Sequence, residues 1–188
     1  MTVIEDRPAD VPEALPRWDV SGFFPSIGSR ELTAAQERLA AEIGRLRTRF
    51  DELGIRGGEP GPVTDAEVAA VEEVLPAVNR LLADLRLVGS YLYAHTTTDA
   101  RDDDAAAAQS RHQAAAAPFA TLDGRLDAWL ARWDLAELTA RSGVAADHAY
   151  ALERGATAAR RQMSGPRRTS PRSWPSPAAG PGPSSTPI

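Results

Sequence analysis

Hydrophobic residues recur at helical spacing in three long stretches of the chain. The first stretch begins after Ser29, a favourable N-cap residue with Glu31 in the first turn, and ends before Gly54. Its apolar positions are separated by three, four or seven residues and form one stripe: Leu32, Leu39, Ile43, Leu46, Phe50 and Leu53. We expect a helix that buries a single face.

The second stretch opens with a capping box, Thr64 to Glu67, and contains Pro76, which is expected to bend the helix. Its apolar residues are Val68, Val71, Leu75, Val78, Leu82, Leu85 and Leu92. They cover enough of the helix to pack on more than one neighbour.

The third stretch starts within "TTTDARDDDAAAAQ", and Pro118 is expected to kink it. Its stripe is small at one end and aromatic at the other: Ala108, His112, Ala115, Phe119, Leu122, Leu126, Trp129 and Trp133. A neighbouring helix can approach closely at the alanines. Two shorter helices, "DLAELTARSG" and "AADHAYALERGATAARRQM", are expected to follow.

These stretches predict an all-α, antiparallel, bundle-like lobe of long helices joined by short connections. Residues 1–28 contain four prolines and the aromatic segment "WDVSGFFPSI", which predicts an extended arm that lies on another part of the protein. Residues 29–164 form the predicted helical domain. Residues 165–188 are rich in proline and serine and are expected to be a disordered tail.

Composition narrows the class of protein. The 188 residues include 43% apolar positions, which is enough for a core, and no cysteine, which removes disulfides and thiolate chemistry. A net charge of −5 argues against a nucleic-acid partner, which would require a concentrated basic face. The acidic N-terminus does not resemble a signal peptide, and no stretch is long and apolar enough for a membrane span. We expect a cytoplasmic protein without a membrane or nucleic-acid partner.

Residues with possible chemistry are scattered. The run "DARDDD" lacks the alternating oxygens, glycine and closing glutamate of a calcium loop, so acids at a helix N-terminus are the better interpretation. His95, His112 and His148 have no zinc-binding spacing, and His112 falls in the predicted core stripe. No serine, lysine or acid pair indicates a nucleophile with its base. The residues alone therefore indicate an interaction or support domain with no catalytic, cofactor-binding or metal-binding residue.

Two further features have a plain and a functional interpretation. The "GIRGGEPGP" loop is glycine-rich, but no strand precedes it and no Lys-Ser or Lys-Thr follows, so a turn is favoured over a phosphate site. Tyr91 and Tyr93 point to different faces of their helix. We expect at least one of them to meet a second surface, against the alternative that both are ordinary half-buried tyrosines.

Three segments carry a resemblance to a known family. "PRWDVSGFFPSIGSRELTAA", "LVGSYLYAHTTTDARDDDAAAAQSR" and "DHAYALERGATAARRQMS" occur in this order and span residues 16–164. They resemble the opening, the long tyrosine-rich helix with Thr-Asp-x-x-Asp, and the stretch before an acidic run in oligoendopeptidase F-type enzymes of the M3 zinc metallopeptidase family. The resemblance implies the helical N-terminal lobe of a larger all-α enzyme that hydrolyses short peptides.

In that family, zinc is held by the histidines of an H-E-x-x-H motif and a downstream glutamate, and the motif glutamate acts as general base. This sequence contains no H-E-x-x-H, so no site residue is carried over. The resemblance implies a chain that is inactive alone, has the catalytic domain as its partner and binds no cofactor itself. The alternative is a freestanding helical module that binds a partner through the "WDVSGFF" arm and the tyrosine face.

The tail has a second interpretation. Residues 166–176 can be written in GC-rich codons so that a shifted frame, read from the third base of Pro166, gives "EEDLAAELAL". That sequence is the start of an acidic amphipathic helix. We expect a frameshift before Pro166, and the alternative is a genuine Pro/Ser-rich linker.

Overall fold

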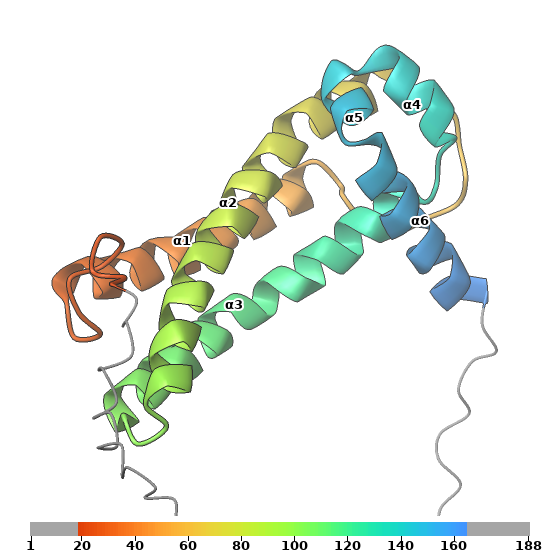
Figure 1. Ribbon diagram of the computed structural model, residues 1–188. Helices are drawn as coiled ribbons and strands as arrows, with labels where there is room; N and C mark the ends of the chain where they lie inside the picture. Colours follow the sequence, from red (N-terminus) through yellow and green to blue (C-terminus); the bar gives the residue numbers. More distant parts are fainter. Residues whose placement is uncertain (1–18, 165–188) are drawn as a thin grey trace, which may run out of the picture.

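The computed structural model describes residues 19–164, and these residues form helices and turns without a strand (Figure 1). The six helices are α1 (Arg30–Glu52), α2 (Asp65–Thr98), α3 (Asp103–Leu130), α4 (Leu135–Arg141), α5 (Gly143–Asp147) and α6 (Ala149–Ser164). The all-α fold predicted from the sequence is confirmed. Trp18 and the predicted tail, residues 165–188, lie outside the described residues.

The helices α1, α2 and α3 pack against one another, and each runs antiparallel to the one before it in the chain (Figure 1). Helix α1 begins and ends as predicted: the Ser29 hydroxyl accepts a hydrogen bond from the Leu32 amide, and Gly54 follows the helix with a φ of 66°. The predicted stripe is buried up to Phe50, whereas Leu53 is the C-cap residue and only half-buried.

Helix α2 contacts neighbours on two sides, as its pattern predicts. The capping box of Thr64 and Glu67 is present, and the helix continues through Pro76. Of the predicted apolar positions, Val68 and Leu82 are only half-buried. The buried set is wider than the predicted one: Ala70, Val71, Val74, Leu75, Val78, Leu81, Leu85, Val88, Tyr91 and Leu92.

The end of helix α3 differs from the prediction that Trp133 belongs to this helix. The helix continues through Pro118 but ends at Leu130, so Trp133 lies in the following turn, although its side chain is still buried. The small end of the stripe does allow a close approach: Ala108 is buried, and its carbonyl accepts a hydrogen bond from Gln36 of α1 at 3.0 Å.

The helices α4, α5 and α6 form a cap that joins the beginning of α2 to the end of α3 (Figure 1). The last predicted helix is interrupted at His148, which separates α5 from α6. At this break the His148 Nδ1 lies 2.8 Å from the Val144 carbonyl, and its Nε2 lies 2.7 Å from the Asn79 amide nitrogen of α2. A single imidazole therefore ties the α5–α6 junction to α2.

The described part of the arm, residues 19–28, is turn-rich and lies on α2. The Phe24 ring is buried and meets the Tyr91 ring edge to face at 5.0 Å. The Tyr91 hydroxyl donates a hydrogen bond to the Phe24 carbonyl at 3.2 Å. Tyr91 thus meets a second surface, as expected, whereas Tyr93 stays 62% exposed on the opposite side of the helix.

Candidate functional site

The three histidines occupy separate places. His112 is buried between α3 and α2, where a Cβ added to Gly89 would lie 3.3 Å from its Nε2. Burial lowers the pKa of His112, and a hydrogen bond with the Leu85 backbone opposes that shift. His95 packs against the Tyr91 ring at 4.7 Å, and its Nε2 is buried with no hydrogen-bond partner in the described structure. The packing role predicted for His112 is confirmed.

The acidic run after α2 caps a helix. The Asp102 carboxylate accepts a hydrogen bond from the Ala105 amide at 2.8 Å, and Asp103 and Asp104 lie in the first turn of α3. Asp99 accepts a hydrogen bond from the Arg101 amide at 2.9 Å. Asp102, Asp103 and Asp104 have the helix-N-terminus role that the sequence predicts, whereas Asp99 is the C-cap residue of α2. Within residues 19–164, no three His, Asp or Glu side chains gather in the way a metal ion would require.

The glycine-rich loop between α1 and α2 lies across the end of α3. The Arg125 guanidinium donates two hydrogen bonds to the Ile55 carbonyl, at 3.1 and 2.9 Å, and Arg132 donates one to the Glu59 carbonyl at 3.1 Å. A Cβ added to Gly57 would lie 3.3 Å from the Ala128 Cβ, so the glycine permits the close approach. The loop is a packed connection, and its carbonyls rather than its amides are engaged by side chains.

The Asp127 carboxylate of α3 packs closely against Gly155 of α6. A Cβ added to Gly155 of α6 would overlap the Asp127 Oδ1 and lie 2.8 Å from its Cγ. Burial raises the pKa of Asp127, and the neighbouring Asp123 adds to the shift. In the turn after α3, the Trp133 indole Nε1 is also buried, without a hydrogen-bond partner in the described part of the chain. No second group of suitable chemistry faces Asp127 among the described contacts, so the geometry indicates a packed structural acid.

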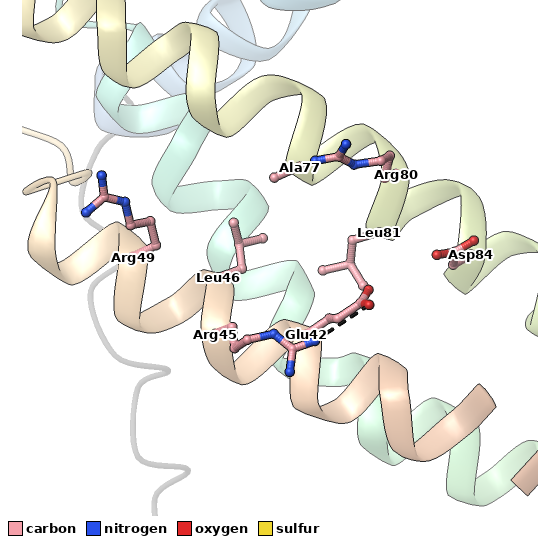
Figure 2. A pocket seen from close by; sticks show the side chains of 8 residues that line it. All are labelled: Glu42, Arg45, Leu46, Arg49, Ala77, Arg80, Leu81 and Asp84. Atoms are coloured by element: carbon pink, nitrogen blue, oxygen red, sulfur yellow. Dashed lines mark ion pairs between the residues drawn. The ribbon is translucent and has the colours of Figure 1, made fainter. Parts of the chain in front are cut away.

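An open groove runs between α1 and α2, on the side away from α3 (Figure 2). Its larger hollow, of about 450 Å³, has the apolar side chains of Leu46, Ala77 and Leu81 at its floor and charged residues at its rims. A second hollow of about 190 Å³ continues the groove toward the arm and shares Glu42 and Asp84 with the first. We refer to the two hollows together as the α1–α2 groove.

The charged side chains at the rims of the groove differ in how closely they form ion pairs. Arg49 is held by Glu73 and Glu52, with nitrogen–oxygen distances of 2.5 and 2.8 Å, and the hydrogen bond to Glu73 is the main cause that raises the pKa of Arg49 and lowers that of Glu73. Arg45 lies 3.6 Å from Glu42. Figure 2 shows Arg80 and Asp84 further along α2.

Sequence analysis did not identify the α1–α2 groove. The available signal was the placement of Arg38, Arg45 and Arg49 beside the apolar stripe of α1, but such arginines are also common on ordinary solvated faces. The residues that the sequence singled out are mostly kept apart. Tyr91 and His95 of α2 do meet, with ring centres 4.7 Å apart, whereas the other histidines, the acidic run, the loop and Tyr93 lie at separate places.

Comparisons with protein-family models, with curated proteins and with solved structures give no match to this chain. None of the helices in residues 19–164 has the length and apolar character needed to cross a membrane.

Proposed function

We propose that this chain forms the helical N-terminal lobe of an oligoendopeptidase F-like M3 metallopeptidase, whose hydrolysis of short peptides depends on a separate zinc-binding domain. The observation that carries the proposal is a contact between two of the three resembling segments. Phe24 belongs to "PRWDVSGFFPSIGSRELTAA" and Tyr91 to "LVGSYLYAHTTTDARDDDAAAAQSR", and the two side chains pack edge to face. Segments that resemble one family at two separated places therefore form one structural unit.

The third resembling segment supplies α6, which packs along the end of α3. Its buried positions, Leu152, Ala156 and Ala159, recur at steps of four and three, which fits a helix that covers the lobe on one side. The described residues do not fit zinc, because no group of three His, Asp or Glu side chains that could hold a metal ion occurs among them. We derive no catalytic step through this lobe, whose role in the enzyme is to limit access of substrates to short peptides.

The experiment that tests this proposal is to determine the DNA sequence that follows the codon for Ser164 and translate it in three frames. We expect a shifted frame that continues as acidic helix and reaches an H-E-x-x-H motif with a downstream glutamate. If no frame contains that motif, the proposal is wrong. In parallel, the purified chain should cleave a fluorogenic peptide no faster with added zinc than with a chelator, and zinc-dependent cleavage would contradict the assigned role.

A second candidate function is a freestanding helical interaction module. The exposed aromatic rings favour it: Phe23 of the arm and Tyr93 of α2 are each 62% exposed. Partner capture from a lysate separates the two proposals, because a single reproducible partner that is lost on Phe23→Ala and Tyr93→Ala substitution favours the module. A chain that aggregates or is rapidly degraded is expected of a lobe without its catalytic domain.

A further inference from the structure

We infer that the first half of α3, residues 103–118, is an acid-sensitive part of the fold. When the His112 ring takes up a proton, this half separates from α1 and α2, while the second half of the helix, residues 119–130, stays packed. The inference does not rest on the proposed function, because it uses only contacts within the helical lobe.

The first half of α3 buries only one large side chain. Its buried positions are Ala105, Ala108 and His112, whereas the second half buries Phe119, Leu122, Leu126, Trp129 and Leu130. The free energy gained by apolar burial grows with the area removed from water, and an alanine side chain is a single methyl group. The contact of the first half with α1 and α2 therefore depends mainly on the His112 ring.

The His112 ring fits closely against α2. The residue is 7% exposed, and its Nε2 lies 3.3 Å from the position of a Cβ added to Gly89. The ring also forms a hydrogen bond with the Leu85 backbone. Protonation makes both ring nitrogens donors and gives the ring a charge, and burying a charge without a partner is unfavourable. A protonated ring is therefore expected to leave this site for water.

Within residues 19–164, no charged side chain offsets this effect. From α2 the ring meets the backbone at Leu85 and Gly89, and α1 places the neutral Gln36 nearby, where it donates a hydrogen bond to the α3 backbone one turn earlier. Arg111 precedes His112 on α3 but is exposed. Burial lowers the pKa of His112, and only the hydrogen bond with Leu85 opposes that shift. The neutral ring is the form that the closed helices accept.

Pro118 lies at the boundary between the two halves. The helix continues through this residue, but proline has no backbone N–H, so the Ala114 carbonyl receives no hydrogen bond from position 118. A helix bends most readily at such a break. Beyond it, Arg160 donates hydrogen bonds to the carbonyls of Ala131 and Trp133, just after α3 ends. The first half can therefore move while the second half keeps its contacts.

The size of the response is set by the pKa of the ring in water. An imidazole in water has a pKa of about 6.5, and burial holds the pKa of His112 lower in the closed helix. As the pH falls below about 6.5, the open form binds the proton before the closed form does, so the population of the open form rises. Between about pH 7.5 and about pH 5.5, the ratio of open to closed form should rise by up to about tenfold.

Native-state hydrogen exchange of the full chain, measured for each amide by NMR, tests the inference. At about pH 5.5 the amides of residues 106–117 should have protection factors at least about tenfold below those of residues 120–130. Low concentrations of urea should speed exchange in the second half much more than in the first, because local separation exposes far less surface than global unfolding. Between about pH 7.5 and about pH 5.5, protection in the first half should fall by up to about tenfold.

Two histidine variants identify the group that responds. His112→Gln cannot take up a proton in this range and should abolish the fall in protection of residues 106–117. His148→Gln is the matched control and should keep the fall, because His148 lies at the α5–α6 junction and contacts Asn79 of α2. A fall that persists in His112→Gln overturns the inference. Equal protection factors and equal urea responses in the two halves at about pH 5.5 also overturn it, since α3 would then open as a whole.

The native chain supplies a second measurement, which holds even if His112→Gln does not fold. The ring signals of His112 are followed by NMR over the same pH range. We expect the protonated ring and the weakly protected first half to appear together. If the ring takes up its proton while residues 106–117 keep their protection, the closed helix accepts the charge and the inference is wrong. None of these results depends on whether an H-E-x-x-H motif is found in the gene, so the two proposals fail separately.

Discussion

The two ends of α3 are held by different chemistry. Near its beginning, α3 packs on α1 and α2 through Ala108 and the buried His112 ring, and Gln36 donates a hydrogen bond to the Ala108 carbonyl. Near its end, Trp129 and Trp133 meet edge to face with ring centres 4.4 Å apart, the Asp127 carboxylate lies against Gly155, and arginines donate hydrogen bonds to nearby backbone carbonyls. The first end therefore packs through small side chains and one ring, whereas the second end adds a few polar contacts to the large buried side chains of Leu126, Trp129 and Leu130.

The largest expected effect is loss of the apolar core. Phe50 is fully buried on α1, beneath the Arg125 guanidinium, which lies 5.6 Å from the ring centre. Replacement by alanine removes its buried area and leaves a cavity, so Phe50→Ala should lower the free energy of unfolding by about 3–5 kcal/mol. Chemical denaturation measures the change. The control is Tyr93→Ala, which affects an exposed ring and should change stability by less than about 0.5 kcal/mol.

The next effect is at the α3–α6 contact. Gly155→Ala places a methyl group against the Asp127 carboxylate, and we expect a loss of about 1–3 kcal/mol because the helices or the carboxylate must shift. In an Asp127→Ala background the obstruction is absent. The same substitution should then stabilise the protein by about 0.5–1 kcal/mol, because alanine is the better helix former. A double-mutant cycle without this change of sign contradicts the close contact.

A smaller effect is expected at the arginine contacts. Arg160 donates hydrogen bonds to the carbonyls of Ala131 and Trp133, at 3.1 and 3.0 Å, just beyond the end of α3. Arg160→Ala should lower the free energy of unfolding by about 1–2 kcal/mol. This is near the lower end of the range for hydrogen bonds from a charged donor, because the side chain is partly in water. Arg161, one residue later and also exposed, is the matched control. Equal losses for Arg160→Ala and Arg161→Ala would show that the two carbonyl bonds contribute nothing specific.

Contacts within one helix could be predicted from the sequence, whereas contacts between distant segments could not. The periodic apolar stripes and the Ser29 and Thr64 caps identify α1, α2 and most of α3, because both signals lie within one helix. The contact between His148 and Asn79, in contrast, joins residues that are 69 positions apart, and no local signal in the sequence indicates it. The end of α3 before Trp133 is another such case, since the Arg160 bonds to that turn come from α6. The α1–α2 groove could not be predicted either, because it depends on how two separate helices are placed side by side.

The smallest expected effect is the pH dependence of stability, and it differs in sign between the two ends of α3. Burial lowers the pKa of His112, so below about pH 6.5 the unfolded chain binds a proton before the folded chain does. The free energy of unfolding should therefore fall as the pH drops from about 6.5 toward the pKa of the folded state. Burial raises the pKa of Asp127, so here the folded chain binds the proton first, and stability should fall as the pH rises above about 3.9.

Two variants separate these contributions. Asp127→Asn keeps the shape of the side chain without its charge, and should be more stable than the native chain at neutral pH but not at pH 3. His112→Gln should remove the loss of stability between about pH 6.5 and the lower pKa, while the neutral-pH value changes only through packing. Denaturation curves collected across this pH range measure both. If Asp127→Asn is less stable than the native chain at neutral pH, the carboxylate has a stabilising partner. An ionic contact would then stabilise the end of α3, instead of a half-buried acid destabilising it.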